Sequence, residues 1–333
     1  MTQRNGAALR LYRNGPIIHS LDALTAAMES IMPDGSRMTD DEERDSFFDS
    51  YMEGFEALQT EEDYYDLAMN YFERAATMNV RYCELFFDPQ GHTSRGVKWE
   101  TMMSGFERAQ KEARSRLGVQ SQWIMCFLRD SPPESAMEHY VFALPYRHMI
   151  VGIGLDSSEP GNSPQLFADV FSLARKDGFK LTAHCDVDQS NVEGHIEQVL
   201  TTIGGTGADR IDHGLNAASD QRLTEVLVRR QIGMTLCPWS YLRHTTYSEL
   251  GQRIRSLFDA GVLITINSDD PAYMEDCWVL HNFLLAKYIC AFTNAEILRL
   301  ARNAVTVCWA GEDVKTLLLS ELDDFGRQHG IVE

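Results

Sequence analysis

Short apolar runs alternate with longer amphipathic segments from about residue 80 onward. Seven runs are rich in β-branched or other apolar residues and end in polar residues or glycine; they span residues 80–87, 122–128, 149–155, 180–184, 210–213, 233–237 and 262–267. The segments between them have helical periodicity, most clearly at residues 99–117, 164–177, 192–203 and 223–230. Strands that alternate with helices in this way predict βαβ units and a parallel sheet.

The chain before residue 80 has a different pattern. Residues 21–31 and 64–78 have helical periodicity, and an acidic linker around residues 40–45 joins them. We therefore expect residues 1–79 to be a helical N-terminal segment and residues 80–333 to form the (β/α) barrel, both within a single domain. A closed barrel of this type needs eight strands, so seven runs predict either an open, doubly wound sheet or a TIM-type (β/α) barrel with seven of its eight βα units.

Polar side chains with catalytic potential stand at the carboxyl ends of four of these runs. Asp156, His184 and His213 each occupy one such position, and the pair Asp269 and Asp270 follows the last run. Parallel sheets build their sites at this edge. A carboxylate and imidazoles can hold a zinc-like ion that activates water there. A lone strand-end histidine is more often structural, but four such positions favour one shared site.

Composition narrows the classes of partner. The chain carries 49 acidic and 30 basic residues, a net charge of -19, which disfavours binding to nucleic acid and to anionic membranes. Its seven cysteines form no CxxC pair, and no apolar stretch has the length of a membrane span or a signal peptide. We expect a soluble cytoplasmic protein that acts on a small molecule; the oligomeric state stays open.

Six motifs, in this order along the chain, resemble those of the adenosine and adenine deaminase family. They are ExFxDPQxHTSRG (84–96), GLDSSE (154–159), LTAH (181–184), RIDHG (210–214), TLCPWS (235–240) and NSDDPAY (267–273). DPQ followed by HTSRG, together with SDDPAY, is most similar to the adenine deaminase branch. The resemblance implies a zinc-dependent TIM-type barrel of purine metabolism, a hydrolase that acts on the C–N bonds of cyclic amidines. Its substrate would be adenine or a related 6-aminopurine, with adenosine as an open alternative.

The same resemblance assigns roles to single residues. His184 and Asp269 match two zinc ligands of the family. His213 matches the histidine that orients and deprotonates the attacking water, and Asp270 matches the aspartate that hydrogen-bonds the purine ring. We expect these four side chains to share one pocket.

The loop after the third run matches the family's base-contacting loop. It contributes Ser157, Ser158 and Glu159 as candidate substrate contacts. Nucleoside deaminases have a glycine there, so a side chain at Glu159 predicts preference for a free base over its nucleoside. An alternative for Ser157 and Ser158 is that they only cap the following turn.

Two departures from the family pattern bear on catalysis. No His-x-His occurs in the 333 residues, although the family takes two further zinc ligands from such a pair on its first strand. We therefore expect weak or absent zinc binding by this chain, in place of the family's one zinc ion per chain, and a natural protein that is longer at its N-terminus. His19 is expected to be an ordinary loop residue.

The second departure is Val187, which stands where the family has the glutamate that protonates the purine ring. Asp186 or Asp188 could replace it, with Asp186 taken as the catalytic candidate, whereas Glu193 is expected to lie within the next helix. Loss of a general acid typically costs 10²–10⁴-fold in rate. A catalytically impaired or non-catalytic relative is thus the alternative to an active deaminase, and a different metal-assisted hydrolase on the same scaffold is a third possibility.

Overall fold

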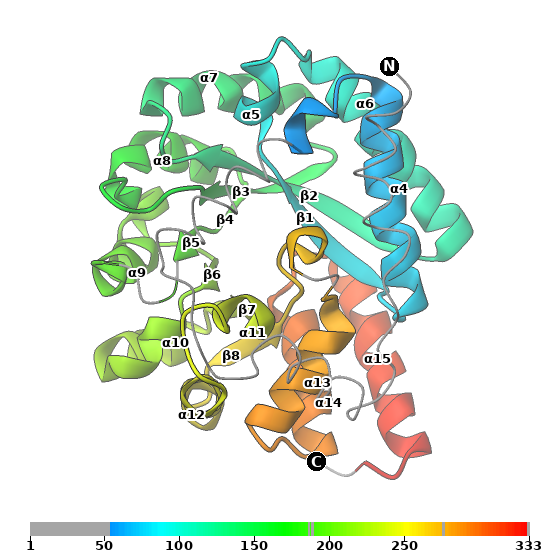
Figure 1. Cartoon of the computed structure of the whole chain (residues 1–333), viewed down its shortest axis with the longest axis vertical. Helices are drawn as coiled ribbons and strands as arrows, with labels where there is room; N and C mark the ends of the chain where they lie inside the picture. Colours follow the sequence, from blue (N-terminus) through cyan, green and yellow to red (C-terminus); the bar gives the residue numbers. More distant parts are fainter. Residues whose placement is uncertain (1–53, 186, 188–189, 275–276, 332–333) are drawn as a thin grey trace. The chain divides into compact units, whose positions relative to one another are not determined.

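The computed structural model describes residues 54–185, 187, 190–274 and 277–331 (Figure 1). These residues divide into two compact units. The N-terminal unit comprises residues 54–214 together with the short segment Cys308–Gly311. The C-terminal unit comprises Leu215–Val307 and residues 312–331. The helix expected for residues 21–31 and the loop residue His19 lie outside the described residues. The single-domain assignment stays a prediction.

Parallel strands form the centre of each unit, as the alternating pattern predicts. The strands are β1 (Tyr82–Phe87), β2 (Gln120–Leu128), β3 (Ile150–Asp156), β4 (Lys180–Leu181), β5 (His184–Cys185), β6 (Arg210–His213), β7 (Gly233–Leu236) and β8 (Leu263–Ile266). In the N-terminal unit β1, β2, β3 and β4 pair in this order, and β5 pairs with β6; in the C-terminal unit β7 pairs with β8. All of these pairings are parallel.

The strand predicted for residues 180–184 is divided into β4 and β5. The two residues between them still join neighbouring strands, because the Thr182 amide donates to the Ile153 carbonyl of β3 and the Asp212 amide of β6 donates to the Ala183 carbonyl. The segment therefore lies between β3 and β6 as one extended stretch, and the sequence-based assignment of a single strand describes its position correctly.

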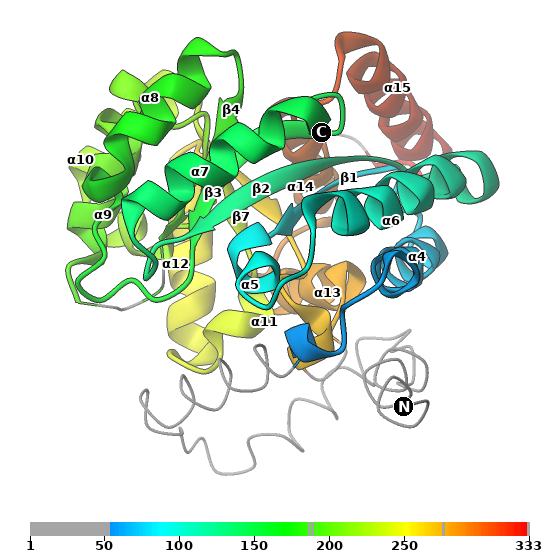
Figure 2. The ribbon, with the colours of Figure 1, turned by 90° about the horizontal axis from the view of Figure 1, so that it is seen from above.

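The α-helices described in the N-terminal unit lie before, between and after its strands along the chain. They are α4 (Glu61–Thr77), α5 (Pro89–Thr93), α6 (Trp99–Glu112), α7 (Pro133–Ala143), α8 (Ala168–Lys176) and α9 (Val192–Thr201). The helix predicted for residues 64–78 is α4, which begins at a capping box formed by Thr60 and Asp63. Helices α4 and α6 run side by side (Figure 2). Their close approach requires Gly105, where a Cβ atom would lie 2.5 Å from the Glu61 carbonyl oxygen.

Aromatic side chains fill the space between these two helices and the sheet. The rings of Phe106 and Trp123 stack with centroids 4.1 Å apart, and Phe87 meets both of them edge-on. Phe72 of α4 closes the cluster against Trp123 and is fully buried. Such pairs add directional contacts to the burial of large apolar surfaces, so they fix α4 and α6 on β1 and β2.

The C-terminal unit has the same strand-and-helix construction. Its helices are α10 (Gln221–Arg230), α11 (Pro238–Tyr241), α12 (Tyr247–Asp259), α13 (Val279–Ile289), α14 (Asn294–Val307) and α15 (Glu312–Gln328). Helix α14 packs on the two strands: Asn303 donates to the Ile264 carbonyl of β8, and Val307 lies where a side chain on Gly233 would be. The pair β7 and β8 is thereby covered on that side.

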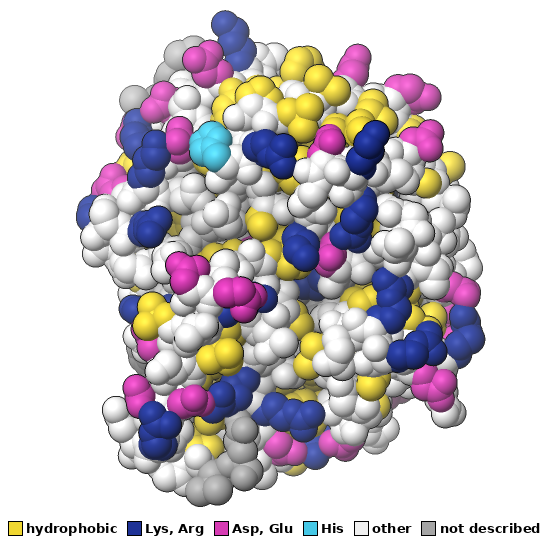
Figure 3. Space-filling model, turned by 180° about the vertical axis from the view of Figure 1, so that it is seen from behind, with side chains coloured by type: hydrophobic (Ala, Val, Ile, Leu, Met, Phe, Trp, Pro, Cys, Tyr) yellow, Lys and Arg dark blue, Asp and Glu magenta, His cyan; other side chains and the backbone are white. Residues whose placement is uncertain are grey.

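The surface carries both signs of charge. On the face seen in Figure 3, Lys and Arg side chains are interspersed with Asp and Glu, and hydrophobic side chains gather toward the upper edge. Among the described helices, none combines the length and the apolar character that crossing a bilayer requires.

Candidate active site

Two of the predicted site residues meet at adjacent strand ends of the N-terminal unit. His184 begins β5 and His213 ends β6, and the parallel register sets Cys185 opposite His213. The two imidazole rings lie 4.4 Å apart between centroids, in an edge-to-face arrangement with an interplanar angle of 77°. The structure thus brings together the predicted metal ligand and the predicted base.

Left-handed backbone conformations mark three of the predicted site residues. Ser157 has φ 70°, His213 has φ 58° and Asp269 has φ 57°. Residues with a Cβ atom rarely adopt this conformation, and such strain concentrates at functional sites, where the surrounding structure holds it. The coincidence of strain with these residues supports a functional role for the strand ends.

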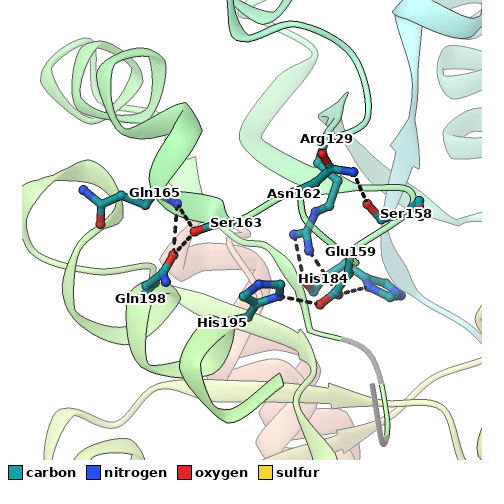
Figure 4. A network of polar contacts seen from close by, with 9 residues as sticks. All are labelled: Arg129, Ser158, Glu159, Asn162, Ser163, Gln165, His184, His195 and Gln198. Carbon is teal, nitrogen blue, oxygen red and sulfur yellow. Dashed lines mark hydrogen bonds and ion pairs between the residues drawn. The ribbon is translucent and has the colours of Figure 1, made fainter. Parts of the chain in front are cut away.

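A buried carboxylate connects the third strand end to His184. Glu159 lies in the loop after β3, and its side chain is 2% exposed. Its Oε1 atom is 2.7 Å from His184 Nδ1 and 3.2 Å from Arg129 Nη1, while its Oε2 atom is 3.0 Å from Nδ1 of His195. Figure 4 shows the three partners arranged around the carboxylate. The sequence singled out Glu159 and His184 but missed Arg129 and His195.

The charge of Glu159 is set by these partners. Burial alone raises the pKa of its carboxyl group, but the Arg129 guanidinium and the hydrogen bonds from His184 and His195 more than offset burial and hold the pKa well below its usual range. Glu159 is therefore an ionised acceptor. The sequence offers no reason to select Arg129, because it lies just beyond the end of β2 and outside the motifs that indicate the site.

A second buried group lies at the ends of β1, β2 and β3. Donor atoms of Asp88, Cys126 and Asp156 all lie within 4.8 Å of one another. Burial raises the pKa of Asp156 well above its usual range, and the neighbouring Asp88 carboxyl raises it further. The pKa of the Cys126 thiol is also raised well above its usual range by burial and by both aspartates. Because two neighbouring buried carboxyl groups do not readily both ionise, Asp88 and Asp156 favour a state in which they share one proton.

The DPQ segment (88–90), which follows β1, forms hydrogen bonds to residues at and after the carboxyl end of the neighbouring strand β2. The Gln90 side chain accepts a hydrogen bond from the Leu128 amide at the end of β2 and donates to the Ser135 hydroxyl of α7. His92 Nδ1 accepts from the Tyr64 hydroxyl and from the Arg95 guanidinium. The motif therefore has a structural role in this chain, since it joins the ends of β1 and β2 to α4 and α7.

The predicted aspartate pair lies at the end of β8 in the C-terminal unit. Asp269 and Asp270 follow the strand after two residues, and Asp270 begins the short helix Pro271–Tyr273. Partial burial, together with the nearby Asp270, raises the pKa of Tyr273 to about 12. Both aspartates thus stand at a strand end, as predicted; the prediction that they share a pocket with His184 and His213 stays a prediction.

The structure describes only some of the residues considered as the general acid. Asp186 and Asp188 lie outside the described residues. Val187 is 1% exposed, so the side chain at the position of the family glutamate is a buried apolar one. Glu193 lies in the first turn of α9, as expected. The assignment of Asp186 as the acid stays a prediction.

The donor chemistry of the described residues is compatible with a metal ion. An ionised carboxylate can only accept a hydrogen bond, so the contact with Glu159 places a proton on His184 Nδ1 and fixes the orientation of the imidazole ring. This is the arrangement typical of a zinc-binding histidine. An Asp carboxylate, as at Asp269, is a second suitable donor.

Comparison with known proteins gives matches over most of the chain. The model of the adenosine deaminase family matches residues 20–325. An uncharacterised deaminase of Schizosaccharomyces pombe is 42% identical over 285 residues, which cover 85% of this chain and 83% of that protein. The adenine deaminase of Chlorobium luteolum is 38% identical over 283 residues, with 85% and 81% covered.

Two solved structures are similar as well. The adenine deaminase of Arthrobacter aurescens has a TM-score of 0.81 and 30% identity, with 97% of this chain and 94% of that chain covered. An amidohydrolase from Burkholderia ambifaria, solved with bound zinc, has a TM-score of 0.73 and 25% identity, with 81% and 76% covered.

Proposed function

The chain belongs to the adenosine deaminase family and has its (β/α)-barrel fold, and from this premise we propose that it deaminates adenine by hydrolysis. The family resemblance and the TIM-type barrel predicted from the sequence are both confirmed by the matches. In the proposed reaction water adds to C6 of the purine, the bond from C6 to the amino nitrogen breaks, and hypoxanthine and ammonia leave. The observation that carries the proposal is the pairing of His184 with His213 at adjacent strand ends.

Zinc is the proposed cofactor. Its support is the His184 imidazole, which Glu159 orients through Nδ1, the carboxylate of Asp269 and the bound zinc of the similar amidohydrolase. A zinc ion held by these residues would lower the pKa of a water molecule and so supply a nucleophile at neutral pH. A catalytic zinc site usually has three protein ligands, and the proposal assigns two of them here.

The remaining roles belong to residues that move or hold protons. His213 accepts a proton from the attacking water, because its imidazole can change protonation state near neutral pH. Asp270 binds the purine ring, and Asp186 donates the proton that the ring nitrogen needs before the amino group leaves. The assignment of Asp270 rests on its match to the family motif, and that of Asp186 on its place beside Val187, with Asp188 as the alternative.

The proposed substrate is the free base. Two of the matched proteins are named adenine deaminases. In the sequence the loop Ser157, Ser158 and Glu159 also departs from the glycine of nucleoside enzymes. A role in purine salvage within the cytoplasm, without nucleic acid or a membrane as partner, is part of the same proposal.

A catalytically impaired relative is the second candidate. The observation that favours it is the buried Val187 where the family has its glutamate, together with the absence of His-x-His from the sequence. Such a protein would keep the purine pocket and lose turnover, because an apolar side chain cannot donate a proton.

The test is release of ammonia by the purified chain, measured with adenine, adenosine and AMP before and after addition of zinc. We expect adenine to be the best substrate, with activity removed by a chelator and restored by zinc. His213→Gln should lower kcat by 10²–10⁴-fold without loss of folding. Binding of adenine with no ammonia release under any condition would instead support the impaired relative, and faster release from adenosine would refute the free-base assignment.

A further inference from the structure

The Glu159 carboxylate is held by groups from three separate elements. Arg129 follows β2, His184 begins β5 and His195 lies in α9. The Arg129 side chain is completely buried, and besides its ion pair with Glu159 it donates through Nη2 to the His184 backbone carbonyl at 2.9 Å. One guanidinium thus contacts both the carboxylate and the backbone of the histidine that the carboxylate orients.

The loop that carries Glu159 is itself tied down (Figure 4). The Asn162 side chain donates to the Ser158 carbonyl at 2.9 Å, and the Asn162 amide donates to the Glu159 carbonyl. The Gln198 side chain of α9 accepts from the Ser163 hydroxyl and, at 3.1 Å, from the Gln165 amide. A carboxylate on a loop with this many anchors has one well-defined position, which is what a group that orients another side chain requires.

We infer that Glu159 is a positioning residue: it holds the His184 imidazole in the Nδ1–H form and fixes the orientation of this proposed metal ligand, while Arg129 keeps Glu159 in place. The inference rests on the proposed function, in which His184 is a metal ligand. It assigns Glu159 a role different from the purine contact that the family resemblance predicts, because both carboxylate oxygens are engaged by the protein. Carboxylates that hold metal-binding histidines in this way typically contribute 10–100-fold to metal affinity.

The test uses Glu159→Gln, which keeps the size of the side chain and removes its charge. One readout is the tautomer of His184, from ¹⁵N NMR of the metal-free, histidine-labelled protein; the other is the affinity for Zn²⁺ in competition with a chelator. We expect the wild type to hold the Nδ1–H form of His184, and Glu159→Gln to shift His184 toward the other tautomer and weaken zinc binding by 10–100-fold.

Two further variants separate this role from a purely structural one. Glu159→Asp keeps the charge beside Arg129 but shortens the reach to His184, so it should fold normally and still weaken zinc binding. His195→Gln removes the other imidazole partner of the same carboxylate. Because that contact is with Oε2, the variant should leave the His184 tautomer and the zinc affinity close to those of the wild type.

Some outcomes would overturn the inference. An unchanged His184 tautomer and unchanged zinc affinity in Glu159→Gln, with a raised KM for adenine, would return Glu159 to the role of purine contact. Equal losses of zinc affinity in Glu159→Gln and His195→Gln would show a general structural network. Failure of the proposed function is distinguishable from both, since the tautomer and zinc readouts need no turnover: they could behave as expected in a chain that releases no ammonia.

Discussion

Arg210, at the start of β6, forms a buried ion pair with Glu84 of β1, from which it is separated by 126 residues of chain. Both side chains are 5% exposed. The guanidinium also lies 4.0 Å from the ring centroid of Trp309, whose amide donates to Glu84 Oε1. Burial alone lowers the pKa of Arg210, but Glu84 and Asp212 together more than offset burial and raise it. The pair therefore joins the first and last strands of the N-terminal unit to the segment Cys308–Gly311.

Removing the Glu84 charge should strongly destabilise the protein. Glu84→Gln would leave the Arg210 charge buried without its main partner, which typically costs about 3–5 kcal/mol. Urea denaturation followed by tryptophan fluorescence measures the loss. The matched control is Glu62→Gln, which removes an ion pair with Arg108 at the surface and should cost less than about 1 kcal/mol. Similar small losses in both variants would mean that the buried pair is not stabilising.

His92 should make stability depend on pH between about 4 and 6.5. Burial, together with the nearby Arg95, lowers the pKa of His92 from 6.5 to about 4. As pH falls through this range the unfolded chain takes up a proton that the folded chain does not, so stability present above pH 6.5 decreases until about pH 4, by roughly 3 kcal/mol. His92→Gln should flatten that part of the pH profile of unfolding free energy. Parallel profiles for the two proteins would contradict the assignment.

Gly105→Ala should destabilise the protein, the reverse of what helix propensity predicts. Replacing glycine by alanine inside a helix normally gains about 0.5–1 kcal/mol. Here the added Cβ atom would lie 2.5 Å from the Glu61 carbonyl oxygen of α4, and overpacking of this kind typically costs about 1–3 kcal/mol. Thermal unfolding decides between the two signs. Ser104→Ala in the same helix is the control and should leave Tm unchanged or slightly raised.

Asp186→Asn should lower kcat for adenine by 10²–10⁴-fold if Asp186 has taken over the role of the missing glutamate. Asp188→Asn is the matched control, with the same change two residues away, and should retain most of the activity. Single-turnover measurements at saturating adenine separate the chemical step from binding. A large loss of kcat in Asp188→Asn, with an active Asp186→Asn, would instead identify Asp188 as the general acid.

The order of elements and the strand-end positions of His184, His213, Asp269 and Asp270 could be predicted from the sequence. Strand periodicity and the polar residue that ends each apolar run are local signals, and parallel strands place their carboxyl ends on one edge whatever the details of packing. The division of residues 180–184 into β4 and β5 could not be predicted, because it depends on hydrogen bonds to β3 and β6, which come from distant parts of the chain.

By itself, the sequence determined the family, the parallel α/β architecture and the residue types at the strand ends, because each depends on residues that are close together along the chain. Only the tertiary structure decided which groups surround those residues. Arg129, Glu159 and His195 are far apart in sequence, yet they converge with His184 around one buried carboxylate. A buried ionised group must find its partners wherever the fold supplies them, and that requirement has no local sequence pattern.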